Sequence, residues 1–118
     1  MALQLNWNKC QENVWCNLLN LNLSHEHFNN LEGIYIIWHG GQNPATVRIG
    51  QGNIRDRLTA HKNDKEILAY ANLTLYVTWS EVSSTNRSGV ETYLANKLNP
   101  KVGERFPNEK AIEVNLPW

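Results

Sequence analysis

The chain has 118 residues, which is enough for one domain with a single hydrophobic core. Hydrophobic residues make up 42% of the chain and include five tryptophans, so an intrinsically disordered protein is excluded. Eleven basic and eleven acidic residues cancel, which excludes a protein that binds nucleic acid through a global positive charge. No apolar run approaches the roughly 20 residues that a transmembrane helix needs.

The N-terminal residues have neither the basic region nor the apolar region of a secretory signal, so we expect a cytoplasmic protein. In that compartment Cys10 and Cys16 are expected to be reduced thiols buried in the core. A zinc site completed by His25 and His27 is the alternative, because these four side chains offer soft or borderline donors. Their spacing matches no compact zinc motif, so buried thiols are the preferred interpretation.

Residues 1–32 are predicted to form an N-terminal extension that packs on a domain formed by residues 33–118. The extension is rich in Asn, Leu and Trp without clean periodicity, and a short helix is expected over residues 11–19. Ser24 is expected to cap a single helical turn that Glu32-Gly33 ends.

Three strands are predicted after this extension. Residues 34–38 are β-branched or aromatic and apolar on both alternating faces, which is typical of a central strand. Residues 40–44 have the composition of a turn, and residues 46–50 return as the hairpin partner. Residues 73–79 alternate apolar and polar side chains, which predicts a half-buried strand.

Two helices complete the predicted order of elements. Asn53 can cap a helix whose inward-facing residues recur at the helical period up to His61. A second helix is predicted over residues 87–98 and stops at Pro100. Residues 111–118 are expected to add a short edge strand. The prediction is an α/β (α+β) domain in the order ββαβα, with a small antiparallel three-stranded sheet flanked by helices.

Polar side chains suited to a phosphodiester are spread along this hairpin and the two helices. In chain order they are Tyr35, Arg48, Arg57, His61 and Glu91. The planar arginine fork pairs with phosphate oxygens, and histidine titrates near neutrality and can act as a general acid or base. A single carboxylate is enough to hold Mg²⁺ together with waters. The set predicts a site that binds a phosphodiester and can cut it.

The order of these residues resembles the GIY-YIG nuclease superfamily. Gly33-Ile34-Tyr35 matches the first motif, and Arg48-Ile49-Gly50 is a variant of the second motif in which arginine replaces tyrosine. The resemblance covers about residues 33–108. It implies a ββαβα core, nucleic acid as the partner with DNA preferred, and one Mg²⁺ or Mn²⁺ ion. It also implies that Tyr35 orients or activates the attacking water and that Glu91 holds the metal ion.

On this resemblance the catalytic roles fall to Tyr35, Arg57, His61 and Glu91. Water polarised near the metal ion would attack the phosphorus, with Tyr35 or His61 as the base. Basic residues outnumber acidic ones between residues 45 and 65, so the phosphate is expected there. Asn108 matches a polar residue that the family contributes after the last helix. The residues assigned to phosphate binding are Arg48, Gly50, Arg55, Lys62 and Asn108.

Each of these assignments has a structural alternative. Tyr35 can be an ordinary core tyrosine, and Arg57 and His61 can lie on an exposed helix face with acidic partners. Glu91 can belong to a capping box that begins at Ser88.

Arg48 is the departure from the family pattern, because arginine cannot serve as a base. Arg48 can clamp phosphate while Tyr35 or His61 acts as base. It can also mark a protein that binds nucleic acid without cutting it, or a scaffold that has taken on another role.

We expect a metal-dependent endonuclease with an atypical site. The alternatives are a non-catalytic nucleic-acid-binding module and a protein-interaction domain that uses exposed tryptophans. A bare domain of this size makes few base contacts, so a partner protein could supply specificity.

Overall fold

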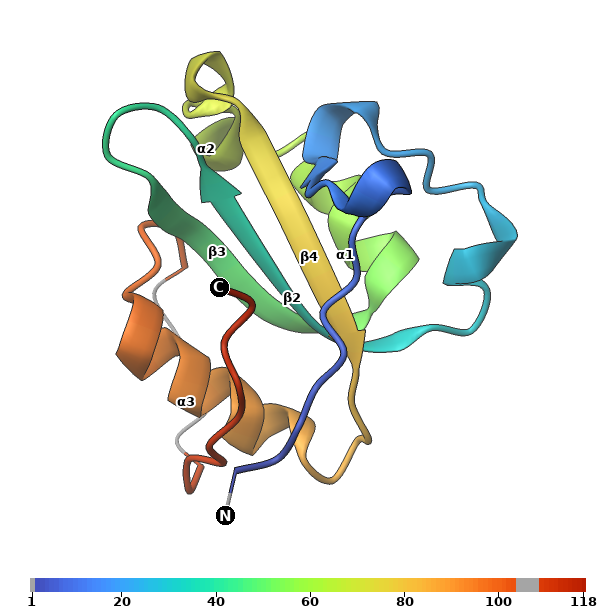
Figure 1. The fold of residues 1–118 in the computed structure, drawn as a ribbon, viewed down its shortest axis with the longest axis vertical. Coiled ribbons are helices and arrows are strands. Elements are labelled where there is room, and N and C mark those ends of the chain that lie inside the picture. The colour runs from blue at the N-terminus through green and yellow to red at the C-terminus, as the bar shows by residue number, and fades with distance from the viewer. Residues whose placement is uncertain (1, 104–108) are drawn as a thin grey trace.

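Strand β2 (Glu32–His39) is a central strand of the sheet. It pairs antiparallel with β3 (Ala45–Asn53) on one side and with β4 (Leu75–Glu81) on the other. Its apolar residues on both faces predict this position, because a central strand is covered on both sides. The computed structural model describes residues 2–103 and 109–118, and Figure 1 shows the sheet with helices packed against it.

Helix α1 (Ile54–His61) follows β3 directly. Asn53 caps this helix, since its Oδ1 accepts the N–H of Asp56 at 3.0 Å. Helix α2 (Lys65–Leu68) is a single turn, and α3 (Arg87–Leu98) spans the residues that the sequence predicts. The α+β class is therefore confirmed, and the predicted order ββαβα is present in β2, β3, α1, β4 and α3.

The prediction of three strands is wrong, because the sheet has four strands within the described residues. The fourth strand, β1 (Cys16–Asn17), pairs with β4 and gives the strand order β1-β4-β2-β3. Two residues are too few to leave an alternating pattern in the sequence. The strand forms because the outer edge of β4 carries backbone groups that need partners.

The helix predicted over residues 11–19 is also wrong. Two single 3₁₀ turns, Gln11–Asn13 and Leu18–Asn20, flank β1 instead. Glu12 and Asn13 have positive φ angles of 59° and 60°, which a right-handed helix does not contain. Pairing with β4 thus outweighs the local helical preference. A third 3₁₀ turn, Glu26–Phe28, is capped by His25 rather than by Ser24.

The C-terminal tail does not form the predicted edge strand in the described residues. Val114 makes one isolated parallel bridge with Leu3, whose N–H donates to the carbonyl of Glu113 at 2.8 Å. The two terminal segments therefore lie side by side (Figure 1). The tail also packs on α3, where the N–H of Ile112 donates to the carbonyl of Gly89 at 3.0 Å.

Both faces of the sheet are covered by apolar side chains. One face, which includes Tyr35, packs against Leu58 of α1. The other face, which includes Ile34, packs against Val90 of α3. The alternation of side chains along β2 thus sends adjacent residues into two different cores.

Cys10 and Cys16 form a disulfide, so the prediction of reduced thiols is wrong. The pairing of β1 with β4 and the preceding turn bring the two Cα atoms to 5.1 Å, a normal span for a disulfide. The sulfurs are thereby withdrawn from the alternative zinc site. Within residues 2–103 and 109–118, no group of three or more His, Cys, Asp or Glu side chains is placed to hold a metal ion.

No helix in the described ranges is long and apolar enough to cross a membrane. Disulfides are typical of oxidising compartments, and the cytoplasmic location expected from the sequence stays a prediction.

Gly33 and Gly50 lie where the strands leave no room for a side chain. A Cβ at position 33 would overlap the carbonyl oxygen of Ser80 on β4, and a Cβ at position 50 would overlap the hydroxyl and ring of Tyr35. Tyr35 and Gly50 are direct partners in the β2–β3 register. The tyrosine ring therefore crosses β3 at a glycine, where β3 has no side chain in its way.

We expect Gly50→Ala to lower the free energy of unfolding by about 3 kcal/mol, because the added methyl group overpacks against the Tyr35 ring. Urea denaturation at neutral pH measures this loss. The same substitution in a Tyr35→Leu background should cost much less, because the overlapping atoms are gone. An equal cost in both backgrounds would contradict the proposed steric cause.

Candidate active site

The centre of the site is a buried pair, Tyr35 on β2 and His61 at the end of α1. The Tyr35 hydroxyl lies 2.5 Å from Nε2 of His61. Tyr35 is 0% exposed and His61 is 7% exposed. Ile54 and Leu58 pack into the core from the same side of α1, and His61 follows at the next helical repeat, which brings its ring over the tyrosine.

His61 is neutral at pH 7 in this environment. The pKa of His61 is lowered from 6.5 to about 4. Burial is the largest cause, and the positive charges of Arg48 and Arg57 add to it, while the negative charge of Asp64 raises the pKa. Nδ1 of His61 lies 4.0 Å from Oδ2 of Asp64. A neutral imidazole has one N–H, and the carboxylate favours it on Nδ1, which leaves Nε2 to accept the hydrogen of Tyr35.

Two guanidinium groups act on this pair. Arg48 lies two residues before Gly50 on the same face of β3, and Arg57 lies four residues before His61 on α1. Burial raises the pKa of Tyr35, whereas the charges and hydrogen bonding of Arg48 and Arg57 lower it. Nε of Arg48 is buried and has no hydrogen-bond partner. Arg57, in contrast to this buried atom, is an exposed residue. The pair therefore lies in a strongly positive local field.

Glu91 of α3 approaches the same strand from the other face of the sheet. Gln51, whose side chain points to the face opposite Arg48, donates through Nε2 to Oε1 of Glu91 at 2.8 Å and to Oγ of Ser88 at 3.2 Å. Glu91 is 6% exposed. Burial raises the pKa of Glu91, against the hydrogen bond from Gln51 and the charges of Arg48 and Arg57. The arginines therefore influence side chains on both faces of β3.

The capping box that was the structural alternative for Glu91 does not describe its contacts. The N-cap residue of α3 is Asn86, and Ser88 bonds to Gln51 instead of closing a capping box. Arg87, four residues before Glu91, pairs with Glu32 at 3.1 Å. Gln51 and Ser88 are site residues that the sequence interpretation missed. The alternation of side chains along β3 could have placed Gln51 toward α3, but only once the pairing of β3 was known.

Two of the residues assigned to phosphate binding point elsewhere. Arg55 donates through Nε to the carbonyl of Leu23 at 2.7 Å and through Nη2 to the carbonyl of His25 at 2.9 Å. Lys62 donates to the carbonyl of Leu21 at 2.5 Å. These cations hold the N-terminal segment against α1. Gly50 has the steric role described above, and Asn108 lies outside the described residues.

The side chains around Glu91 fit a magnesium ion at the lower limit of protein ligation. Glu91 supplies one carboxylate and Ser88 one hydroxyl oxygen, whereas Gln51 directs its Nε2 donor group at both of them, and Mg²⁺ commonly keeps several waters. Two features oppose binding of the ion. Burial raises the pKa of Glu91 and so disfavours its charged form, and the positive charges of the neighbouring arginines repel a cation. A negatively charged phosphate on the arginines would weaken that repulsion.

Comparison of the chain with protein-family models, with curated proteins and with solved structures finds no match. The assignment of a function therefore depends on the chemistry of this site and on the order of its residues.

The depressed pKa of His61 predicts a stability that falls with acidification. The unfolded chain takes up the proton near pH 6.5 and the folded protein only near pH 4, so the free energy of unfolding should decrease by about 3 kcal/mol as pH falls through that window. Glu91, whose pKa is raised, contributes the opposite slope. Chemical denaturation of the wild type and of His61→Gln between pH 4 and 7 isolates the histidine term, and equal slopes would count against it.

Proposed function

We propose that the protein is a metal-dependent endonuclease of the GIY-YIG type, which hydrolyses phosphodiester bonds of nucleic acid, with DNA preferred. The observation that carries this proposal is the contact of the Tyr35 hydroxyl with Nε2 of His61 beside the two guanidinium groups of Arg48 and Arg57. An acid–base pair next to two phosphate-binding side chains suits attack on a phosphodiester.

The buried pair can move a proton away from an attacking water. The water oxygen would bond to phosphorus and release its proton to the oxygen of Tyr35, whose own proton passes to Nε2 of His61. The bond from phosphorus to the leaving oxygen breaks, and that oxygen takes a proton from solvent. A histidine with a pKa of about 4 is a weak base in the free protein. Phosphate bound to Arg48 and Arg57 cancels charge that depresses this pKa, so substrate binding makes His61 a stronger base.

Arg48 is useful for charge and geometry in this proposal rather than as a base. Its guanidinium stays protonated and can hold two phosphate oxygens at once. Arg57 is exposed and can meet the substrate first. Because both guanidiniums approach the Tyr35 hydroxyl, a phosphate that draws Arg57 outward would uncover the hydroxyl for water. Glu91, with Ser88, would hold the Mg²⁺ or Mn²⁺ ion, which supplies further charge stabilisation on the phosphate when bound.

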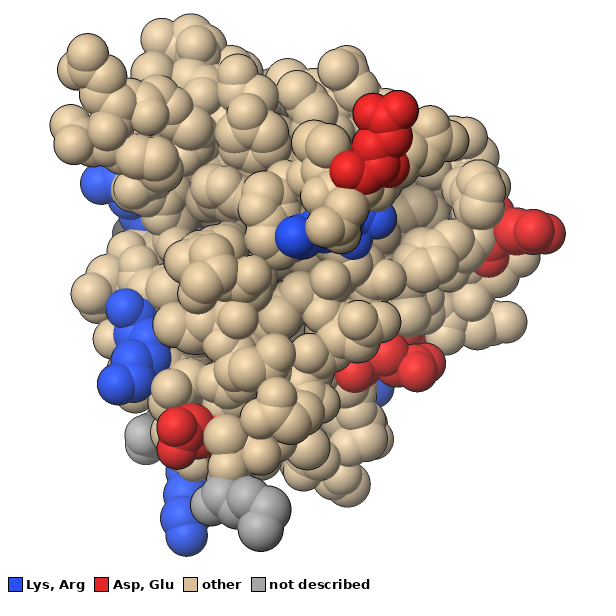
Figure 2. Space-filling model, viewed as in Figure 1, with Lys and Arg blue, Asp and Glu red and all other residues tan. Residues whose placement is uncertain are grey.

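The second candidate is a non-catalytic nucleic-acid-binding module on the same scaffold. Full burial of Tyr35 and the raised pKa of Glu91 favour it, because both side chains are held in states unsuited to catalysis until something binds. Basic and acidic side chains are scattered over the face seen in Figure 2, without a large patch of one sign. Either function therefore depends on the local arginine pair.

Nicking of supercoiled plasmid in Mg²⁺ or Mn²⁺ tests the catalytic proposal. We expect nicking by the wild type that stops in EDTA and falls at least 100-fold in Glu91→Gln, because that variant keeps the shape of the side chain and loses its charge. Glu113→Gln is the matched control, since residue 113 is exposed on the C-terminal tail. An intact plasmid, or equal nicking by Glu91→Gln, would reject the catalytic proposal.

Arg55 and Arg57 allow a paired test of phosphate binding, because they lie two positions apart in α1 and point to different sides of the helix. In EDTA, Arg57→Gln should weaken DNA binding and reduce the slope of log affinity against log salt by about one phosphate contact. Arg55→Gln should leave that slope unchanged, because its guanidinium is bonded to carbonyls of the N-terminal segment. Equal slopes for the wild type and Arg57→Gln would exclude Arg57 from the phosphate site. Fluorescence anisotropy of a labelled duplex measures both variants.

A further inference from the structure

The disulfide between Cys10 and Cys16 closes a turn whose two ends are attached to the same strand. Asn8 precedes the turn, and its backbone N–H and its Nδ2 donate to the carbonyl of Trp79 on β4, at 3.0 and 2.8 Å. After the turn, the two residues of β1 pair with β4. Each end of the turn is therefore held on β4 by hydrogen bonds that do not depend on the bond between the sulfurs.

The backbone inside this turn is strained. Glu12 and Asn13 have φ angles of 59° and 60°. Residues other than glycine rarely adopt these left-handed angles, and glutamate tolerates them less well than asparagine. The disulfide keeps the ends of the turn together, with 5.1 Å between the two Cα atoms. Because cleavage of the disulfide lets both residues leave the left-handed region, relief of this strain favours the reduced form.

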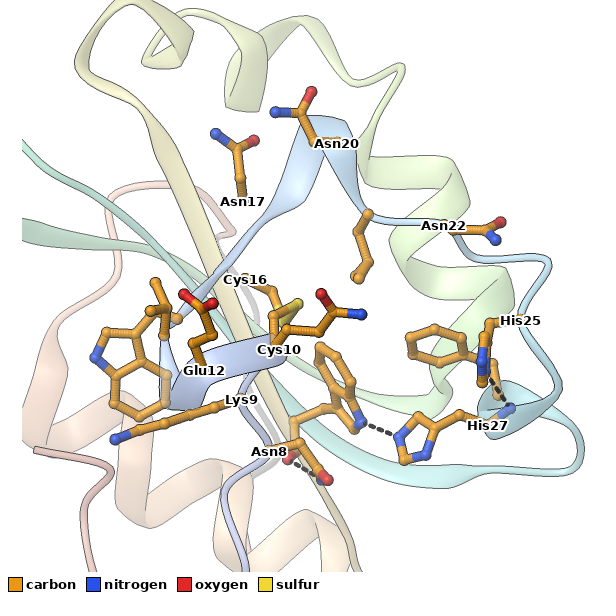
Figure 3. A pocket seen from close by; sticks show the side chains of 16 residues that line it. Asn8, Lys9, Cys10, Glu12, Cys16, Asn17, Asn20, Asn22, His25 and His27 are labelled. Atoms are coloured by element: carbon orange, nitrogen blue, oxygen red, sulfur yellow. Dashed lines mark hydrogen bonds between the residues drawn. A yellow bond between two sulfur atoms is a disulfide. The ribbon is translucent and has the colours of Figure 1, made fainter.

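The two sulfurs differ in their access to solvent. Cys10 is exposed, whereas Cys16 is 1% exposed and belongs to the core. Both line a pocket of about 770 Å³, and Figure 3 shows the disulfide between Glu12 on one side and His25 and His27 on the other. A small thiol can therefore approach Cys10 from solvent. The two cysteines are only 6 positions apart, and short loops gain the least stability from a disulfide.

The position of this turn affects contacts on both faces of the sheet. Cys16 belongs to the core on the α1 face, whereas the preceding residue, Trp15, packs on the core of the α3 face. The ring of Trp15 contacts those of Trp38 and Trp118, at centroid distances of 5.3 and 6.2 Å. Release of the turn therefore frees a large aromatic side chain on one face while the other face keeps a small one.

We propose that the disulfide between Cys10 and Cys16 is a redox switch that sets the position of residues 10–15. In the oxidised form the turn is one wall of the pocket and holds Trp15 against its aromatic neighbours. In the reduced form the turn opens, the wall moves away and Trp15 leaves these neighbours, while the strands of the sheet stay paired. The inference does not depend on the proposed function.

Reduction follows thiol–disulfide exchange with two thiols, such as two molecules of glutathione. The thiolate of the first bonds to Sγ of Cys10, the bond between the two protein sulfurs breaks, and Sγ of Cys16 leaves as a thiolate that takes a proton from solvent. The thiolate of the second attacks the glutathione sulfur of the mixed disulfide. This step releases Cys10, which is protonated in turn, and yields oxidised glutathione. Cys16 then remains as a small buried thiol, which suits a hydrophobic core.

Equilibration in glutathione buffers, followed by NMR of the indole N–H groups, tests the switch. As the ratio of reduced to oxidised glutathione is raised, the fraction of reduced protein should pass through one half, because accessible or strained disulfides are labile and structural ones resist glutathione. The indole signals of Trp15, Trp38 and Trp118 should shift with that fraction. The signal of Trp7, whose indole N–H donates to the carbonyl of Asn115 at 2.9 Å, should stay in place.

Three variants sharpen the test. Cys10→Ser should give the spectrum of the reduced form in every buffer, and it leaves the core intact because residue 10 is exposed. Glu12→Asn should make the disulfide roughly 2- to 5-fold harder to reduce, because asparagine adopts left-handed angles with less strain. Glu26→Asn is the matched control and should leave the equilibrium unchanged, since residue 26 is exposed in the same segment but has no positive φ angle.

Several results would overturn the inference. Reduction by a phosphine but not by glutathione would identify a structural disulfide. A reduced protein that loses the dispersed signals of the sheet would show global unfolding instead of a switch, and one whose indole signals match those of the oxidised form would show no movement of the turn. Equal equilibria for Glu12→Asn and Glu26→Asn would exclude the strained turn as the cause.

Discussion

The contact between Tyr35 and Gly50 is the constraint on which the rest of the structure depends. The phenol ring needs the missing side chain at position 50 to cross β3, and only then does its hydroxyl reach Nε2 of His61. The same contact sets the register of β2 and β3 and the position of α1 above them. A packing requirement of the core and the geometry of the candidate site are therefore one feature, which explains why a tyrosine and a glycine 15 residues apart belong to one pattern.

The elements that could be predicted are those whose signals are local. The alternation along β4, the asparagine cap of α1 and the apolar period of α3 lie within each element, and β2 shows its central position by being apolar on both faces. The N-terminal segment could not be predicted in the same way. Strand β1 has two residues, and what stabilises it is the distant edge of β4 and a disulfide that the sequence interpretation did not expect. Contacts of this kind leave no periodicity to read.

The candidate site also contains residues that the sequence could predict and residues whose role depends on distant contacts. The order of motifs predicted that Tyr35, Arg48, Arg57, His61 and Glu91 would form one site. Tyr35 contacts His61 near the two arginines, whereas Glu91 contacts Gln51 on the opposite face of β3. Charge alone pointed to Arg55 and Lys62, but a helix has several faces, and those two side chains face the N-terminal segment. Gln51 was overlooked because an amide between two glycines carries no charge to draw attention. Its importance depends on which helix covers that face of β3.

Helix α1 has a consequence for how the molecule responds to disturbance. Within eight residues it carries Arg57 and His61 on the side of the candidate site and Arg55 on the side of the N-terminal segment, with Lys62 immediately after it. So short a helix moves as a rigid body, and a shift at one side is transmitted to the other. The N-terminal segment is accordingly a mechanical support for the contact between Tyr35 and His61, and substitutions in it can change the alignment of these two side chains from a distance. Robustness of the site is set as much by these anchoring contacts as by the polar side chains themselves.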